Sequence, residues 1–242
     1  MGKKGVFKYQ QFSIQQVHAA MKVGTDSDLL GTLSAGGKRI LDVGTGTGVL
    51  SLMLAQRYPE AIITAIEIDE NAVIDATANF AASPMGERIT LHHISFQDYL
   101  VKARAEGLCG ACDAVVCNPP YFDQSLECPD DSRTRARHSS SLPFDVLAAG
   151  AYELLEPGGL FSVCIPGEVL RKFKGECQLA GFSLEDLYRI KTLPQSQAKR
   201  FVLVMKKSTT GAAREHECTM LNEDGTRSPW YREIMHGFLL GM

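Results

Sequence analysis

No apolar run in this sequence approaches the roughly 18 consecutive residues that a membrane-spanning helix requires. The first residues, M-G-K-K-G-V-F, also lack the apolar core of about 7–15 residues that is typical of a secretion signal. The sequence therefore predicts no membrane association and a place in the cytoplasm.

Cysteine is present, but its pattern indicates neither disulfides nor a metal site. The seven cysteines are odd in number and scattered, which fits thiols that are kept reduced. Cys109 and Cys112 form one C-x-x-C pair, and no second pair follows at the spacing of a zinc site. We expect a turn there and no bound metal.

Internal repeats, low-complexity tracts and a strong net charge are absent as well. The formal net charge of −3 neither demands nor forbids a polyanionic partner. Its distribution is more informative, because residues 187–214 contain no acid and the N-terminus is also basic. A charge run is usually a solvated face, but one-sided runs at both ends of a mildly acidic chain modestly raise the odds of a nucleic-acid surface. The basic residues concerned are Arg189, Lys191, Lys199, Arg200, Lys206, Lys207 and Arg214, with Lys3, Lys4 and Lys8.

What the 242 residues do contain is an alternation of β-branched apolar runs with helical periodicity, which predicts an α/β fold with a doubly wound, mostly parallel sheet. Two further β-rich segments near the end predict an antiparallel edge, for seven strands in all. The expected strands are 38–43, 61–67, 89–94, 113–118, 159–165, 182–192 and 199–206. The expected helices are 47–57, 70–82, 96–105, 143–155 and 167–179, with one more beginning at Ser228-Pro229.

The domain organisation follows from these elements. We expect residues 31–207 to form one domain, 1–30 to form a segment that covers its binding site, and 208–242 to form an extension packed on the same domain. We favour a monomer, although the sequence leaves the oligomeric state open.

The first strand runs directly into D-V-G-T-G-T-G at residues 42–48, followed by a helix. Glycines there allow a ligand to approach the backbone closely, and the helix N-terminus adds donors. The spacing G-x-G-x-G differs from the G-x-G-x-x-G of dinucleotide sites, and the Asp42 carboxylate would repel a pyrophosphate. A ligand with an ammonium group, such as S-adenosylmethionine, fits better. We expect Asp42, Gly44, Thr45 and Gly46 to bind it.

An acid also follows the second strand. Glu67 lies 23 residues beyond Gly44, close to the roughly 20-residue interval at which such folds place a carboxylate on ribose hydroxyls. Ile68 is expected beside it. Asp69 is interpreted as the N-cap of the next helix.

The fourth strand ends in N-P-P-Y at residues 118–121. An aromatic amine is a poor nucleophile, because its lone pair is delocalised into the ring. The Asn118 side-chain oxygen and the Pro119 carbonyl can accept its two hydrogens and direct the lone pair at a methyl group. Pro119 and Pro120 keep these acceptors still, and Tyr121 offers a face on which a planar base can stack. An ordinary loop start is the alternative for N-P-P alone.

D-V-G-T-G-T-G, E-I-D and N-P-P-Y occur in the order that resembles class I S-adenosylmethionine-dependent methyltransferases acting on amino groups, whose fold is Rossmann-like. The resemblance spans about residues 20–206. It implies S-adenosylmethionine as cofactor, S-adenosylhomocysteine as product, and Asn118, Pro119, Pro120 and Tyr121 as the catalytic residues, with Asn118 also contacting the cofactor.

A narrower resemblance lies in F-K-Y-Q-Q-F (7–12) and A-M-K-V-G-T-D-S-D-L-L-G (20–31), which are similar to segments of bacterial valine-tRNA adenine-N6 methyltransferases. In that family the target is the adenine just 3′ of the anticodon. The resemblance implies tRNA as partner. Lys22, Thr25 and Asp26 would line the methionine end of the cofactor, with helix capping the alternative for Asp26, and Arg133, Arg135 and Arg137 would bind the substrate. The sequence departs from the family pattern after the third strand, where many of these enzymes carry an acid that binds the cofactor adenine; here we expect Ser95 and Phe96 to make that contact, with Asp98 as the alternative. From the basic run at 187–214, Arg200 is expected to bind the substrate.

Other functions remain open at this point. A glutamine-N5 protein methyltransferase shares N-P-P-Y, but it usually carries an N-terminal helical domain that is absent here. A DNA adenine methyltransferase would need a recognition domain. A nucleotide-binding dehydrogenase is disfavoured by the glycine spacing, and a catalytically silent scaffold by the intact 118–121 motif.

Overall fold

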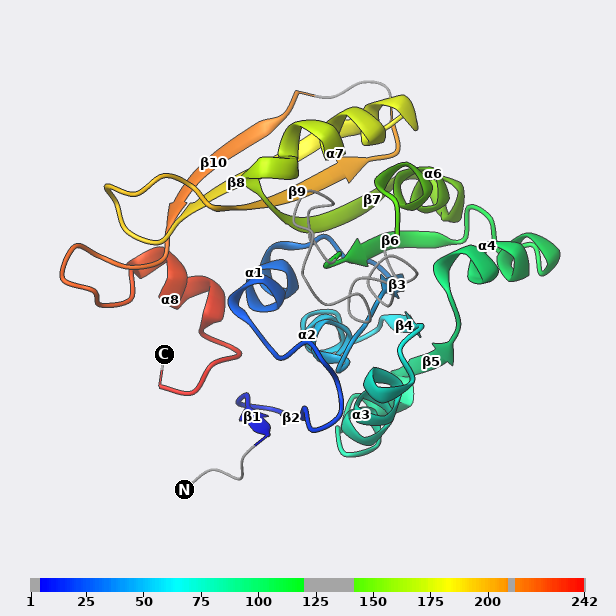
Figure 1. Ribbon diagram of the computed structural model, residues 1–242, viewed down its shortest axis with the longest axis horizontal. Helices are drawn as coiled ribbons and strands as arrows, with labels where there is room; N and C mark the ends of the chain where they lie inside the picture. The colour runs from blue at the N-terminus through cyan, green and yellow to red at the C-terminus, as the bar shows by residue number, and fades with distance from the viewer. Residues whose placement is uncertain (1–4, 120–141, 209–211, 242) are drawn as a thin grey trace, which may run out of the picture.

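The computed structural model describes residues 5–119, 142–208 and 212–241. Its central element is an eight-stranded sheet in the order β10-β8-β9-β7-β6-β3-β4-β5, in which β9 runs antiparallel to both of its neighbours (Figure 1). The strands are β3 (Arg39–Val43), β4 (Ile62–Glu67), β5 (Ile89–His93), β6 (Cys112–Cys117), β7 (Leu155–Pro166), β8 (Ser183–Lys191), β9 (Arg200–Lys206) and β10 (Arg214–Thr219). A separate antiparallel ribbon pairs β1 (Val6–Lys8) with β2 (Ser13–Gln15).

Helices cover both faces of the sheet, as the doubly wound prediction requires (Figure 1). One face packs against α1 (Thr25–Leu33), α2 (Val49–Arg57), α3 (Glu70–Ala81) and α8 (Pro229–Met235); the other packs against α4 (Phe96–Ala105), α6 (Phe144–Leu154) and α7 (Gly167–Leu179). Adjacent strand residues serve opposite faces: Ile40 lies in the first core and Leu41 in the second. This layered arrangement confirms the α/β prediction. Strands buried on both faces must be apolar throughout, which is the pattern seen in the sequence.

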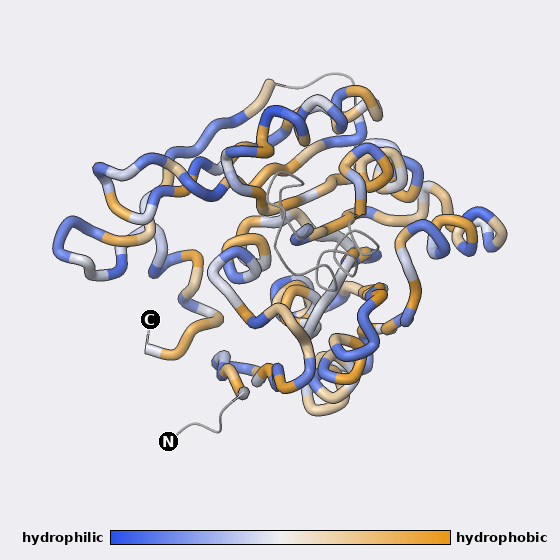
Figure 2. The backbone as a smooth tube through the Cα atoms, viewed as in Figure 1, coloured by the Kyte–Doolittle hydropathy of each residue, from blue (hydrophilic) through white to orange (hydrophobic). Residues whose placement is uncertain are grey.

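The main sheet has eight strands among the described residues, so the prediction of seven is wrong. The additional strand, β10, pairs in parallel with β8 at the edge of the sheet. Its sequence R-E-H-E-C-T contains only one buried residue, Cys218, and is largely hydrophilic in colour in Figure 2. An edge strand that buries so little side-chain surface leaves no apolar pattern to detect.

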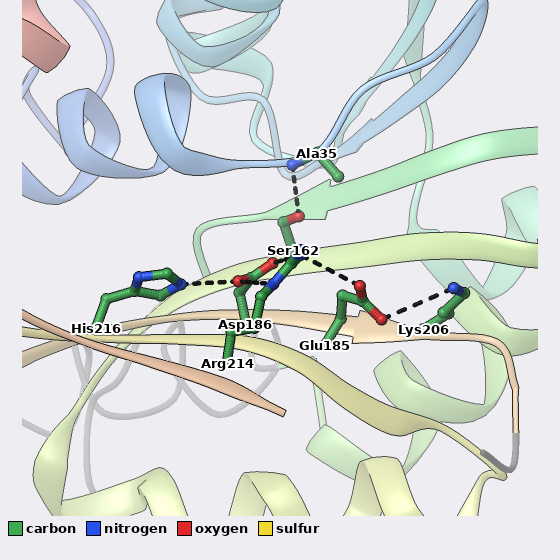
Figure 3. A network of polar contacts seen from close by, with 7 residues as sticks. All are labelled: Ala35, Ser162, Glu185, Asp186, Lys206, Arg214 and His216. Carbon is green, nitrogen blue, oxygen red and sulfur yellow. Dashed lines mark hydrogen bonds and ion pairs between the residues drawn. The ribbon is translucent and has the colours of Figure 1, made fainter. Parts of the chain in front are cut away.

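Polar contacts hold this edge strand in place (Figure 3). Asp186 of β8 accepts two hydrogen bonds from Arg214, at 2.9 and 2.7 Å, and its carboxylate lies 2.8 Å from Nε2 of His216. The His216 ring stacks on Tyr188, with ring centroids 4.4 Å apart. Burial raises the pKa of Asp186, but the bonds from Arg214 and His216 outweigh it and hold the pKa below its usual value. These partners come from two segments that are adjacent only in the folded sheet.

The two ends of the chain are joined to each other. Tyr9 and Leu239 form an isolated antiparallel bridge, and the Gln10 side chain donates to the carbonyls of His236 and Leu239 at 2.7 and 2.8 Å. The Tyr9 hydroxyl donates to the buried Asp28 carboxylate of α1. Contacts between residues far apart in sequence thus hold the start of α1 against one side of the sheet.

The strand order reverses at β3, which lies between β4 and β6. In folds of this type, ligands bind outside the carboxyl ends of the strands at such a switch point. Val43 is paired in register with Cys117 across β3 and β6. The glycine loop follows Val43, and Asn118 follows Cys117. Both therefore begin at the carboxyl ends of neighbouring strands, at the same level of the sheet.

Candidate active site

The glycine loop is open to a ligand. Gly44 and Gly46 have φ values of 70° and 58°, and a Cβ on either would meet no described heavy atom within 4 Å. Gly48, the N-cap of α2, has φ 83°, and a Cβ there would lie 2.4 Å from the Phe80 ring. The first two glycines thus leave space above the backbone, whereas the third allows α2 to pack on α3.

Asp42 lies buried at the end of β3, beneath this loop. Its Oδ2 accepts hydrogen bonds from the hydroxyls of Thr45 and Ser51, both at 2.7 Å. Its Oδ1 has no hydrogen-bond partner among the described residues. Burial raises the pKa of Asp42 to about 6, although the two hydroxyl bonds oppose the shift. A buried carboxylate with an unused acceptor fits a ligand that brings positive charge.

Glu67 fastens the end of β4 to the glycine loop. Its Oε2 accepts from the backbone N–H of Gly46 at 2.8 Å, and its Oε1 accepts from those of Ile68 and Asp69 at 2.8 and 2.9 Å. The predicted ribose-binding acid therefore also organises the loop. Ile68 beside it is half exposed, and Asp69 caps α3 through Asn71 N–H, as predicted.

The two residues expected at the cofactor adenine have structural roles in this fold. Ser95 is the N-cap of α4: its hydroxyl accepts from the N–H of Asp98 at 3.0 Å and donates to the Asp98 carboxylate at 2.6 Å. Phe96 is only 5% exposed, and its ring packs against Gly150 in the core. The ring face is therefore covered by protein. The sequence could not indicate that the Phe96 ring is buried, because an aromatic side chain at the start of a helix can face either a ligand or the core.

Asn118 follows β6 and is half-buried, and its side-chain Nδ2 donates to the Ser27 hydroxyl at 3.3 Å. Pro119 behind it is buried. The remaining residues of the expected catalytic corner, Pro120 and Tyr121, lie outside the described residues, as do Arg133, Arg135 and Arg137.

The first turn of α1 approaches the same place from the other side. Asp26 lies inside α1, whose N-cap is Gly24, so Asp26 does not cap the helix; its carboxylate pairs instead with Arg200 of β9. Asp26 and Arg200 line an open cavity of about 600 Å³ together with Lys199 and Glu168. Thr25 begins the helix. The Lys22 ammonium, in contrast, donates to the carbonyls of Gln16 and Ala19 and closes a local loop.

Several residues of the basic run at 187–214 form ion pairs within the fold. The fold places acids opposite it: Glu215 lies 2.9 Å from Arg189, and Glu217 lies 2.8 Å from Lys191. Arg214 and Lys206 pair with acids of β8. Lys199 and Arg200, at the cavity, are the members of the run that lie nearest to Asp26.

Two absences can be stated for the described part of the chain. Its His, Cys, Asp and Glu residues form no group of three that could hold a metal ion. None of its helices has the length and apolar character needed to span a bilayer.

Sequence reasoning missed Ser27 and Ser51. Ser27 contacts Asn118, and Ser51 supports Asp42, but both are polar residues inside helices. The two serines lie at different sequence distances from the residues that they contact. Only the packing of α1 and α2 on the sheet brings Ser27 next to Asn118 and Ser51 next to Asp42.

Comparisons with known proteins agree with this geometry. Residues 9–135 match the family model "Methyltransferase small domain". The chain is 43% identical over 202 residues to a tRNA1(Val) (adenine(37)-N6)-methyltransferase from Phocaeicola vulgatus, covering 83% of each chain. It is 38% identical over 237 residues to the protein of that name from Bacteroides thetaiotaomicron, covering 97% of each. The Serratia proteamaculans protein of the same name is 32% identical over 98% of this chain and 91% of its own length.

Among solved structures, a predicted O-methyltransferase from Agrobacterium tumefaciens superposes with a TM-score of 0.67 at 20% identity, over 88% of this chain and 96% of that one. A methyltransferase complexed with SAH gives a TM-score of 0.60 at 18% identity, over 85% of this chain and 57% of that one. These structures support the fold.

Proposed function

The chain belongs to the family of the tRNA1(Val) (adenine(37)-N6)-methyltransferases, and from this membership we propose that it methylates the exocyclic N6 amine of adenine in tRNA. The methyl donor is S-adenosylmethionine, and the target is the adenine just 3′ of the anticodon of a valine tRNA. We propose that the enzyme acts in the cytoplasm.

One observation of the structure carries the proposal. The glycine loop and Asn118 follow the registered pair Val43 and Cys117, at the carboxyl ends of two neighbouring strands. A ligand above Gly44 and Gly46 and a group held by Asn118 would therefore meet at the switch point of the sheet. The open space over these glycines and the spare oxygen of Asp42 fit a cofactor with an ammonium group and no phosphate.

When bound, the cofactor supplies an electrophilic methyl group on a sulfonium, which is an excellent leaving group. The protein contributes position: the Asn118 Oδ1 and the Pro119 carbonyl accept the two N6 hydrogens and hold the nitrogen lone pair in line with the methyl carbon. The amine nitrogen would displace the sulfur from the methyl carbon, and the N6 proton would then pass to solvent, so that atoms and charge balance.

The test is transfer of labelled methyl groups to total tRNA from a strain that lacks the gene, followed by nucleoside analysis. We expect label in N6-methyladenosine from valine tRNA and none with heat-denatured protein. Label in protein glutamine or in DNA, with none in tRNA, would contradict the proposal.

Cofactor binding should depend on pH through Asp42. The carboxylate favours the cofactor ammonium by its charge, so binding must lower the pKa of Asp42 from about 6. Above pH 6 the group is ionised and affinity is full; as the pH falls through 6 the carboxyl becomes protonated and affinity declines, by up to about tenfold per pH unit. Calorimetry with S-adenosylhomocysteine from pH 5 to 8 measures this.

Two variants serve as controls for that pH profile. Asp42→Asn should bind more weakly and lose the pH dependence. Asp28→Asn removes another carboxyl whose pKa burial raises to about 6, but which lies in α1 beneath Tyr9. It should keep the parent profile. An unchanged profile in Asp42→Asn would remove Asp42 from cofactor recognition.

For tRNA, we propose that Arg200 exchanges its Asp26 partner for a substrate phosphate at the cavity. Both side chains of this pair are about one-third exposed, so solvent still screens their attraction and a polyanion can compete. Arg200→Gln should weaken tRNA binding and reduce the slope of log K against log salt by about 1. Arg104→Gln removes the same charge from the last turn of α4, where Arg104 pairs with Glu153, and should leave the slope unchanged. Equal slopes in all three proteins would exclude Arg200 from the RNA interface.

A further inference from the structure

The shape of the glycine loop depends on contacts from outside the loop. Thr47 lies between Gly46 and Gly48, whose φ values are 58° and 83°. Because glycine has no side chain to restrict its rotation, this stretch of backbone has little conformational preference of its own. Two N–H groups at the start of the loop donate to the Ile66 carbonyl, at 3.0 Å each, and the Gly46 N–H donates to Glu67. The end of β4 therefore holds the first part of the loop, and another element holds the second.

That element is α3, through the side chain of Asn79. Asn79 is 1% exposed, and its Nδ2 donates to the carbonyl of Thr47 at 2.8 Å. The same Nδ2 donates to the carbonyl of Gln15 in β2 at 2.8 Å, and the Asn79 Oδ1 accepts from the Gln15 N–H at 2.7 Å. One buried amide thus connects α3, the N-terminal ribbon and the glycine loop.

The partners of this amide fix its orientation. All three are backbone groups, and a backbone N–H can only donate whereas a backbone carbonyl can only accept. Rotated by 180°, the amide would place its oxygen against two carbonyls and its N–H groups against another N–H. The two bonds to Gln15 therefore keep Nδ2 directed at Thr47.

We propose that Asn79 is a positioning residue for the cofactor: it holds the Thr47 carbonyl, so that the glycine loop keeps the shape that leaves space over Gly44 and Gly46. This inference rests on the function proposed above, in which the cofactor lies over those two glycines. Without the bond from Asn79, binding must also order the loop, and affinity falls by the cost of that ordering. Asn79 acts through Thr47 and is itself buried in the protein.

The test is Asn79→Ala. The Kd of S-adenosylhomocysteine, measured by calorimetry, should rise about three- to tenfold, as expected for one lost hydrogen bond. In methyl transfer to tRNA, the KM for S-adenosylmethionine should rise by a similar factor, and kcat should change less than about twofold, because bound cofactor orders the loop again. A variant that only folded less well would instead lower kcat and leave KM unchanged. An unchanged Kd in folded Asn79→Ala would overturn the proposal.

The matched control is Asp75→Ala. Asp75 lies one turn earlier in α3, is 3% exposed, and accepts from the N–H groups of His18 and Ala19 at 2.9 and 2.8 Å. Both bonds go to the N-terminal segment rather than to the glycine loop. Asp75→Ala should therefore lower the melting temperature, as Asn79→Ala does, but change the Kd less than about twofold. Equal rises in Kd in the two variants would mean that the N-terminal segment carries the effect, and the proposed link to the loop would be wrong.

A second readout uses only the parent protein, so it does not depend on how a variant folds. S-adenosylhomocysteine should slow hydrogen exchange of the Asn79 Nδ2 protons more than that of the Val115 N–H in the centre of the sheet, because the ligand suppresses local opening of the loop. If both rates change by the same factor, Asn79 is not linked to the loop.

Failure of this inference can be told apart from failure of the proposed function. If Glu67→Ala weakens binding and Asn79→Ala does not, only the role of Asn79 is wrong. If neither variant changes the Kd, the cofactor does not lie at the glycine loop, and both proposals fall. If Asn79→Ala raises the Kd as expected but the parent transfers no methyl group to tRNA, the proposed function fails and the role of Asn79 in cofactor binding stands.

Discussion

Asn118→Ala should lower the rate of methyl transfer to tRNA by about 100- to 1,000-fold, as is seen when one preorganised polar group is removed from an active site. The expected loss is large because Asn118 holds one of the two acceptors for the target amine, and alanine leaves that hydrogen without a partner in a half-buried site. Single-turnover kinetics with saturating cofactor measure the step directly.

The loss should be confined to the chemical step. Asn118 follows β6 directly, and its side chain donates a hydrogen bond to Ser27 at 3.3 Å. We therefore expect S-adenosylhomocysteine affinity and melting temperature to stay near those of the parent. Near-normal turnover in a folded Asn118→Ala protein would show that the corner after β6 is only structural.

Glu67→Ala should weaken cofactor binding by about 1.5–3 kcal/mol, as expected for the loss of charge-assisted hydrogen bonds. This corresponds to roughly a 10- to 150-fold rise in Kd. Two effects contribute: the ribose hydroxyls lose an acceptor, and the glycine loop loses its bond from Gly46 N–H to the carboxylate. Calorimetry with S-adenosylhomocysteine gives the total.

A modified ligand separates these two contributions. The parent should prefer S-adenosylhomocysteine to its 2′,3′-dideoxy analogue, whereas Glu67→Ala should bind the two about equally. A variant that keeps the full preference for the ribose hydroxyls would mean that Glu67 acts only by organising the loop. Glu67 contributes to the organisation of the loop in either case, because three backbone N–H groups donate to its carboxylate.

The sequence predicted those parts of the site that depend on local conformation. Gly44 and Gly46 occupy the left-handed region, which few other residues tolerate, so the loop could be recognised from composition alone. Glu67 and Asn118 follow apolar strands directly, and the carboxyl ends of parallel strands meet at one edge of a sheet. The capping role of Asp69 and the helix start at Ser228-Pro229 were also readable, because both depend on residues only a few positions apart.

The predictions that failed or stayed incomplete concern interactions between distant segments. The seven-strand prediction omitted β10, which is held by Asp186, Arg214 and His216 rather than by an apolar pattern. Four basic residues of the run at 187–214 pair with acids of β8 and β10, and such pairing depends on strand order; they are Arg189, Lys191, Lys206 and Arg214. Phe96 is 5% exposed and its ring packs against Gly150 of α6, and its expected contact with the cofactor adenine stays a prediction.

The sequence by itself therefore determined the α/β fold, the glycine loop, and the two strand ends that carry Glu67 and Asn118, since each depends on conformational preferences and hydrophobic periodicity within a few residues. Tertiary structure alone decided which groups face these residues. Ser27 is 91 positions from Asn118, and Asp26 is 174 positions from Arg200. Contacts across such distances arise only when helices and strands pack in one particular order, and no local pattern encodes that order.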